Sequence, residues 1–313
     1  MKKVFLFLTM CIFVCAACIP EYRPPVQAVT PPPSIPAAPI TTGSAANLSR
    51  ITHSPELEYE AVPSPDGRRL LIAIDGTSIG MITLGETGMK IIAGPNAFSP
   101  NWFPDGQSII FSNGAIGDGT MMRKRFDGPG MVFITPKPLT LSDQDASVSP
   151  DGKRILFQGR IDDKENFNIC TVNVDGTSFT TYGRGGRPSW HPKDNVILFQ
   201  GGNPRQLFTM DLRSGTVTQL TSGNYLNHRA KWSPDGNWIV FVSTRDGERN
   251  HLFLMARDGS RVTQLTSGGC YETDPHFSID GYIYFATNAG APNPNVKYRD
   301  IWRLQPIYPT SVK

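Results

Sequence analysis

The chain of 313 residues contains 30 glycines and 27 prolines and carries a formal net charge of +3. Glycine and proline at this density break long helices, which excludes an all-α or coiled-coil protein, while 39% hydrophobic residues are enough for a packed core. No block of lysine and arginine stands out along the chain, so the sequence predicts no nucleic-acid partner.

The first 17 residues have the pattern of a signal peptide. Lys2 and Lys3 precede an apolar run, 4–14, which is shorter than the roughly 20 residues that a membrane-spanning helix needs. The segment that follows, CAAC, resembles the lipobox of bacterial lipoproteins, which implies cleavage after residue 17 and a lipid on Cys18. That family usually has leucine where this chain has Cys15. Ordinary cleavage that releases a soluble secreted protein is the alternative.

Residues 18–46 form a proline-rich segment with eight prolines and almost no large apolar side chains. Such a segment cannot build a core, and we expect it to be extended and polyproline-like. Behind a lipidated Cys18 it would be a stalk that spaces the next domain from the membrane, while a proline-rich recognition ligand is the alternative. By the sorting rule of some bacterial lipoproteins, Ile19 after the anchor indicates the outer membrane, with the protein facing the periplasm.

A pattern of about twelve residues recurs six times further along the chain. Each copy has a Ser-Pro-Asp-Gly turn, or a variant of it, followed by an apolar run that favours a strand. The aligned turn positions follow one another at intervals of 39, 46, 42, 42 and 45 residues, the length of one four-stranded propeller blade. These positions are Asp66, Asp105, Asp151, Lys193, Asp235 and Asp280.

The residues between the copies complete an antiparallel unit. A third β-rich run, such as 206–212, ends in a second tight turn, and a fourth run, such as 216–223, closes the unit. Four strands, two hairpin turns and no helical period predict an all-β fold. We therefore predict a six-bladed β-propeller of four-stranded antiparallel blades.

The repeats resemble those of TolB-type β-propellers. The string WSPDG at 232–236 and the strings RDGS and QLT within 257–266 carry the resemblance, which covers about residues 48–306. The fourth copy has Pro-Lys-Asp-Asn at 192–195, and we expect a different turn there rather than a missing blade. TolB itself has an additional α/β domain before its propeller, where this chain has the proline-rich segment.

The two ends of the repeat region fit together. The sixth copy contains three expected strands, and no fourth strand follows Pro306. A matching strand lies at the other end, at 48–52, where Arg-Ile-Thr stands in place of Gln-Leu-Thr. We predict that this N-terminal strand closes the last blade, because closure removes exposed sheet edges. The propeller then spans residues 47–306, and residues 307–313 form a C-terminal tail.

Two patterns raise the question of catalysis. The string GTSIG at 76–80 matches the G-x-S-x-G of serine hydrolases, but it lies in an expected hairpin without the strand-to-helix elbow that this motif needs. The five histidines lack metal-motif spacing, although His228 and His276 fall in or near strands that would line the channel. We expect no catalytic residue, no metal and no cofactor. A histidine metal site like that of pectate-degrading lyases with a similar repeat is the alternative.

One residue in each copy lies six positions before the turn and should face the mouth of the central channel. Three of the six are acidic and two are basic, a mixed-charge ring that suits a peptide or a partner loop bound through charge-assisted hydrogen bonds. The alternative is that the mouth is polar only because water reaches it. The predicted ring consists of Glu60, Ser99, Asp145, Arg187, Arg229 and Asp274.

These features predict a non-catalytic lipoprotein of the bacterial cell envelope whose propeller docks partner proteins. The resemblance to TolB implies envelope proteins as partners, peptidoglycan-associated ones among them, and a role as scaffold or transport accessory. A glycan-binding or polysaccharide-lyase-like propeller with a site in the channel is the alternative. A propeller that serves only as a structural spacer is a third hypothesis.

Overall fold

The computed structural model describes residues 40–114, 119–128, 130–134, 139–162, 166–247, 249–289 and 298–309. Strands are the regular secondary structure of these ranges, and none of the described residues forms a helix that could cross a membrane. The predicted signal peptide, Cys18 and most of the predicted stalk lie outside the described residues.

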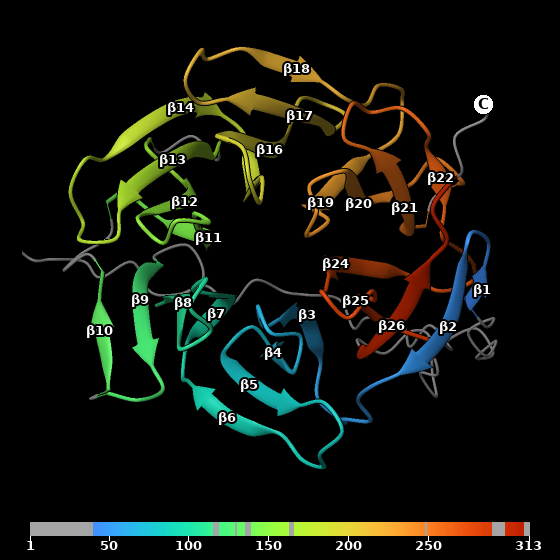
Figure 1. Cartoon of the computed structure of the whole chain (residues 1–313), viewed down its shortest axis with the longest axis horizontal. Coiled ribbons are helices and arrows are strands. Elements are labelled where there is room, and N and C mark those ends of the chain that lie inside the picture. The colour runs from blue at the N-terminus through green and yellow to red at the C-terminus, as the bar shows by residue number, and fades with distance from the viewer. Residues whose placement is uncertain are drawn as a thin grey trace, which may run out of the picture. The chain divides into compact units, whose positions relative to one another are not determined.

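Six four-stranded antiparallel sheets surround a central channel as blades, which confirms the predicted six-bladed propeller (Figure 1). The first strands of neighbouring blades lie side by side around the channel. Blades 1 to 3 are β3 (Glu58–Pro63), β4 (Arg69–Ile74), β5 (Ser78–Thr83) and β6 (Lys90–Ala93); β7 (Ala97–Trp102), β8 (Ser108–Asn113), β9 (Thr120–Arg125) and β10 (Met131–Phe133); and β11 (Asp143–Val148), β12 (Arg154–Gly159), β13 (Asn168–Asn173) and β14 (Thr180–Arg184). Blades 4 to 6 are β15 (Gly186–Trp190), β16 (Val196–Gly201), β17 (Gln206–Asp211) and β18 (Val217–Gln219); β19 (Asn227–Trp232), β20 (Trp238–Ser243), β21 (His251–Ala256) and β22 (Thr263–Gln264); and β24 (Glu272–Phe277), β25 (Ile283–Thr287), β26 (Asp300–Pro306) and β2 (Ala45–Arg50).

The N-terminal strand β2 closes the last blade, as predicted. It runs antiparallel to β26, with Ala45 opposite Pro306 and Arg50 opposite Trp302 (Figure 1). The preceding strand, β1 (Ile40–Thr42), pairs with β23 (Thr266–Gly268), which follows the last strand of blade 5. Pairing with the propeller thus begins earlier than the boundary predicted at residue 47, because strand edges of blades 5 and 6 satisfy the backbone of this segment.

In blades 1 and 4 a side chain at the start of the turn between the first two strands accepts backbone N–H groups of that turn. In blade 1 the Ser64 hydroxyl accepts a hydrogen bond from the backbone N–H of Arg69 at 2.9 Å. In blade 4 a histidine takes this place: His191 Nδ1 accepts the N–H groups of Lys193 and Asp194 at 3.2 and 2.9 Å. The fourth copy therefore forms a complete blade with a different turn, as predicted.

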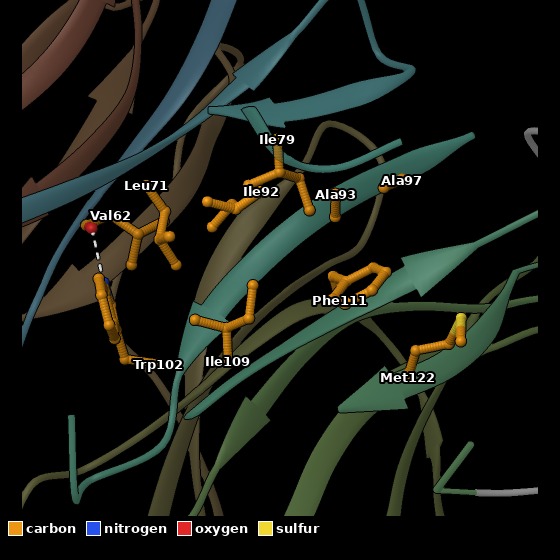
Figure 2. Packing of buried hydrophobic residues seen from close by; sticks show 10 residues of the cluster. All are labelled: Val62, Leu71, Ile79, Ile92, Ala93, Ala97, Trp102, Ile109, Phe111 and Met122. Atoms are coloured by element: carbon orange, nitrogen blue, oxygen red, sulfur yellow. Dashed lines mark hydrogen bonds between the residues drawn. The ribbon is translucent and has the colours of Figure 1, made fainter. Parts of the chain in front are cut away.

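The core lies between neighbouring blades, where the apolar faces of two sheets meet. Between blades 1 and 2 it includes Leu71, Ile79, Ile109 and Phe111, all fully buried (Figure 2). The indole of Trp102 packs at the edge of this cluster and donates its N–H to the carbonyl of Val62, at 2.9 Å. This bond joins the first strands of two blades and fixes their spacing around the channel.

Candidate functional site

A β-bulge in the first strand of each blade aims one side chain into the channel. The antiparallel register between the first two strands shifts once in every blade, for example between Gln144 and Ser147. Five of the six predicted ring residues occupy these bulges with φ between 47° and 55°, a left-handed conformation that costs an ordinary residue roughly 1–2 kcal/mol. They are Ser99, Asp145, Arg187, Arg229 and Asp274. The sixth, Glu60, lies in the bulge of blade 1.

All six predicted ring residues line one small central cavity. At its centre the Asp274 carboxylate, 5% exposed, accepts hydrogen bonds from Arg229 and from Arg187 Nη1, the latter at 3.4 Å. Arg187 also lies 3.7 Å from Asp145, whose carboxylate accepts the Ser99 hydroxyl at 3.1 Å. Although burial opposes it, the two arginines hold the pKa of Asp274 well below its usual range. The ring charges therefore pair with one another, and binding of a partner by the ring stays a prediction.

Glu60 completes the ring through a histidine of the neighbouring blade. Its carboxylate lies 3.2 Å from His276 Nε2. Burial, assisted by the charge of Lys231, lowers the pKa of His276, so the imidazole is neutral at neutral pH and donates its Nε2–H to Glu60. The Glu60 carboxylate of blade 1 thus also has its hydrogen-bond partner within the propeller.

A much larger hollow of about 690 Å³ opens beside the ring, between blades 3, 4 and 5. We call it the arginine hollow after its four arginines, Arg184, Arg187, Arg205 and Arg229. Its other polar side chains are His228 and the amides Gln144, Gln158, Asn166, Gln200 and Asn203, and none of its described lining residues is acidic. A second hollow of about 250 Å³ shares Gln144, Arg187 and Arg229 with it, so both lie at the same end of the channel.

The hollow opens at blade 4 because a side chain is missing there. One residue before the ring position, blade 4 has Gly186. The other blades carry a side chain at the same place: Tyr59, Phe98, Gln144, His228 and Thr273. A Cβ on Gly186 would stand only 2.8 Å from Gln158 Oε1, so glycine here also lets the Gln158 amide approach the bulge.

Two glutamines that sequence reasoning missed support the arginine bulges. Gln158 Oε1 accepts the backbone N–H of Arg187 at 2.8 Å, and Gln200 Oε1 accepts that of Arg229 at 3.1 Å. Each glutamine reaches from the second strand of one blade to the first strand of the next. The signal was present in the sequence as the shared Ile-Leu-Phe-Gln of the third and fourth copies, whereas Arg184 and Arg205 lie outside the repeated pattern.

The two histidines near the channel have separate partners. His276 pairs with Glu60, while His228 Nε2 lies 3.4 Å from Asn250 Oδ1. Burial and the nearby charge of Arg229 lower the pKa of His228 to about 4. Across the described ranges, no three His, Cys, Asp or Glu side chains are grouped as metal ligands would be. In the G-x-S-x-G segment, Ser78 begins strand β5 rather than a helix.

Known proteins support the repeat assignment. A family model described as the TolB beta propeller domain matches residues 178–303. The uncharacterized protein Atu1656 of Agrobacterium fabrum is 26% identical over 216 residues, which cover 66% of this chain and 71% of that protein. The uncharacterized peptidase YuxL of Bacillus subtilis is 28% identical over 180 residues, half of this chain but only 24% of the relative.

Solved structures share the fold at low sequence identity. A structure assigned to TolB from Agrobacterium tumefaciens has a TM-score of 0.63 and 21% identity, over 86% of this chain and 99% of that one. A gluconolactonase from Xanthomonas campestris has a TM-score of 0.64 and 14% sequence identity, over 88% of this chain and 97% of that one. An oligogalacturonate lyase in complex with manganese has a TM-score of 0.57 and 13% sequence identity, over 89% of this chain and 98% of that one. The fold thus carries enzymes as well as TolB, and residues 178–303 of this six-bladed β-propeller are TolB-type repeats.

Proposed function

We propose that this protein is a non-catalytic binding protein of the bacterial cell envelope, whose propeller docks a partner protein at the mouth of its channel. One observation carries the proposal: a hollow of about 690 Å³ opens beside a ring of fixed, mutually paired charges. Concave sites with a few fixed polar groups are the usual form of a binding site. The rigid ring holds the walls of this one in place before any partner arrives.

The place of the protein in the envelope is part of the proposal. A signal peptide over residues 1–17, a lipid on Cys18 and a proline-rich stalk would hold the propeller on the periplasmic face of the outer membrane. The partners would then be other envelope proteins, peptidoglycan-associated ones among them. The TolB-type repeats support this, since the resemblance to TolB implies envelope partners.

Site-specific photocrosslinking in native cells tests the docking surface. A photoreactive residue at Asn166, exposed in the wall of the arginine hollow, should give an adduct with a distinct envelope protein. The matched control is Arg213, exposed in the turn after β17, about one strand length of 17–20 Å from the hollow. Mass spectrometry identifies the adduct, and titration with that purified protein measures the affinity. Equal adducts at both positions, or none at Asn166, would sink the proposal.

A glycan-binding or lyase-like function is the second candidate. Its supporting observation is the same wide hollow with arginine walls, in a fold shared with an oligogalacturonate lyase. Incubation of the full-length protein with polygalacturonate, followed by ultraviolet detection of unsaturated products, decides between the two. Steady product formation without a protein adduct at Asn166 would replace the docking proposal with the enzyme.

A further inference from the structure

The charges of the arginine hollow are not balanced in the way those of the ring are. Arg187 and Arg229 face the ring, where Asp145 and Asp274 compensate them. Arg184 and Arg205 lie on the exposed rim, and no carboxylate of the described residues comes within ion-pair distance of either. The two rim arginines are therefore the uncompensated positive charges of the hollow.

The remaining groups of the hollow add hydrogen-bond donors but no negative charge. His228 is neutral at neutral pH, because burial and Arg229 keep its pKa near 4. The amides of Asn166 and Asn203 are exposed at the rim beside the two arginines. Guanidinium groups with neighbouring amide N–H donors are the donor set that binds carboxylates best, often in a bidentate manner.

We infer that the arginine hollow is a carboxylate-binding site that takes an acidic segment of the partner protein, with Arg184 and Arg205 as its main anchors. The inference rests on the proposed docking function. Charge complementarity supports it, since Arg184 and Arg205 are uncompensated positive charges in the wall of the hollow and none of its described lining residues is acidic. The second hollow adjoins it through Gln144, Arg187 and Arg229, but Glu60, Asp145 and Asp274 line that one. We therefore place the acidic segment within the arginine hollow, whose volume of about 690 Å³ has room for more than a single carboxylate.

A titration of the full-length protein with three probes tests the inference. The probes are a hexaglutamate peptide with blocked ends, the matched hexaglutamine peptide and trigalacturonate. Hexaglutamate should bind and hexaglutamine should not, and a rise from about 50 to about 300 mM salt should weaken binding several-fold. The variant Arg184→Ala/Arg205→Ala should lose at least about tenfold in affinity.

The control removes the same charge from the other end of the blades. The variant Arg68→Ala/Arg213→Ala changes two exposed arginines in hairpin turns away from the hollow and should bind hexaglutamate within about twofold of the wild type. All four arginines are exposed, so both variants should keep the wild-type melting temperature, which checks their folding. A loss of the same size in both variants would overturn the inference, because net charge alone would then explain binding.

The other outcomes separate the two proposals. If hexaglutamate fails to bind while Asn166 still crosslinks a partner, the carboxylate site is wrong and docking stands. If hexaglutamate binds through Arg184 and Arg205 but no partner is crosslinked, the carboxylate site stands and docking is wrong. If trigalacturonate binds more tightly than hexaglutamate with the same arginine dependence, the ligand is an acidic glycan and the protein segment is refuted.

Discussion

Replacing Gly236 with alanine should destabilise the protein far more than the same change at the equivalent turn of blade 3. Gly236 has a φ of +78°, and a Cβ there would lie 2.4 Å from His191 Nε2. The imidazole cannot move away easily. Its Nδ1 accepts two backbone N–H groups, and its ring stands edge-on against Trp232 with centroids 4.7 Å apart.

Gly152 is the matched control, since it occupies the same turn position with a φ of +72° and a Cβ added there would have no neighbouring atom within 4 Å. Gly152→Ala should therefore lower the free energy of unfolding only by the strain of placing alanine in a left-handed backbone conformation, about 1–2 kcal/mol. Gly236→Ala adds the cost of overpacking, about 1–3 kcal/mol more. The free energy of unfolding should fall by about 2–5 kcal/mol in that variant.

Thermal unfolding measures the difference in stability between Gly236→Ala and Gly152→Ala, since each kcal/mol lowers the melting temperature of a domain of this size by about 2–4 °C. The same glycine substitution made in a His191→Ser variant shows whether the extra loss of stability comes from the histidine. Serine stands at the position of His191 in blades 1, 3, 5 and 6, and in a His191→Ser background Gly236→Ala should cost no more than Gly152→Ala. Equal losses for the two alanine variants in the wild-type background would refute the reasoning, as would an extra loss that persists without His191.

Two further predictions concern buried carboxylates. Asp274→Asn leaves Arg229 without its buried counterion and Arg187 with Asp145 alone, and it should lower the free energy of unfolding by about 3–5 kcal/mol in urea. Asp194→Asn, at an exposed ion pair, should lower it by less than about 1 kcal/mol, and equal losses would contradict the paired ring. Burial raises the pKa of Glu58 from 4.5 to about 7, so the stability that its protonated form contributes is complete below pH 4.5 and is lost as pH rises to about 7. At 1.36 kcal/mol per pH unit this loss is about 3 kcal/mol, and unfolding measured across this range should show it in the wild type but not in Glu58→Gln.

The fold was predictable because its signals repeat. Six copies of one turn fix the blade number, and a fixed spacing of six residues from that turn places Asp145 and Asp274 at equivalent bulges. The strand that closes blade 6 was predictable for the same reason, since it resembles the fourth strands of the other units. Each of these predictions needs only local spacing, which a sequence states directly.

The arginine hollow was not predictable from the sequence because it depends on a side chain that one blade lacks and on ion pairs between residues of different blades. It opens where Gly186 lacks the side chain that Tyr59 and Phe98 supply in blades 1 and 2, and such a gap matters only once three blades are assembled. The mixed charges of the ring were visible in the sequence. That Asp274 lies between two arginines from different blades, so that these charges pair with one another, follows only from the bulge geometry.

Reversal of charge at the ring arginines would therefore be a poor test of binding. Arg187 and Arg229 hold the buried Asp274, so a change at either shows its effect first in stability and only then in affinity. The rim arginines differ, because they are exposed and no described carboxylate holds them. In a scaffold of six similar blades the inner residues fix the ring, and we expect recognition at the positions where one blade departs from the repeat. Blade 4 departs at its turn and at Gly186, and the hollow lies beside it.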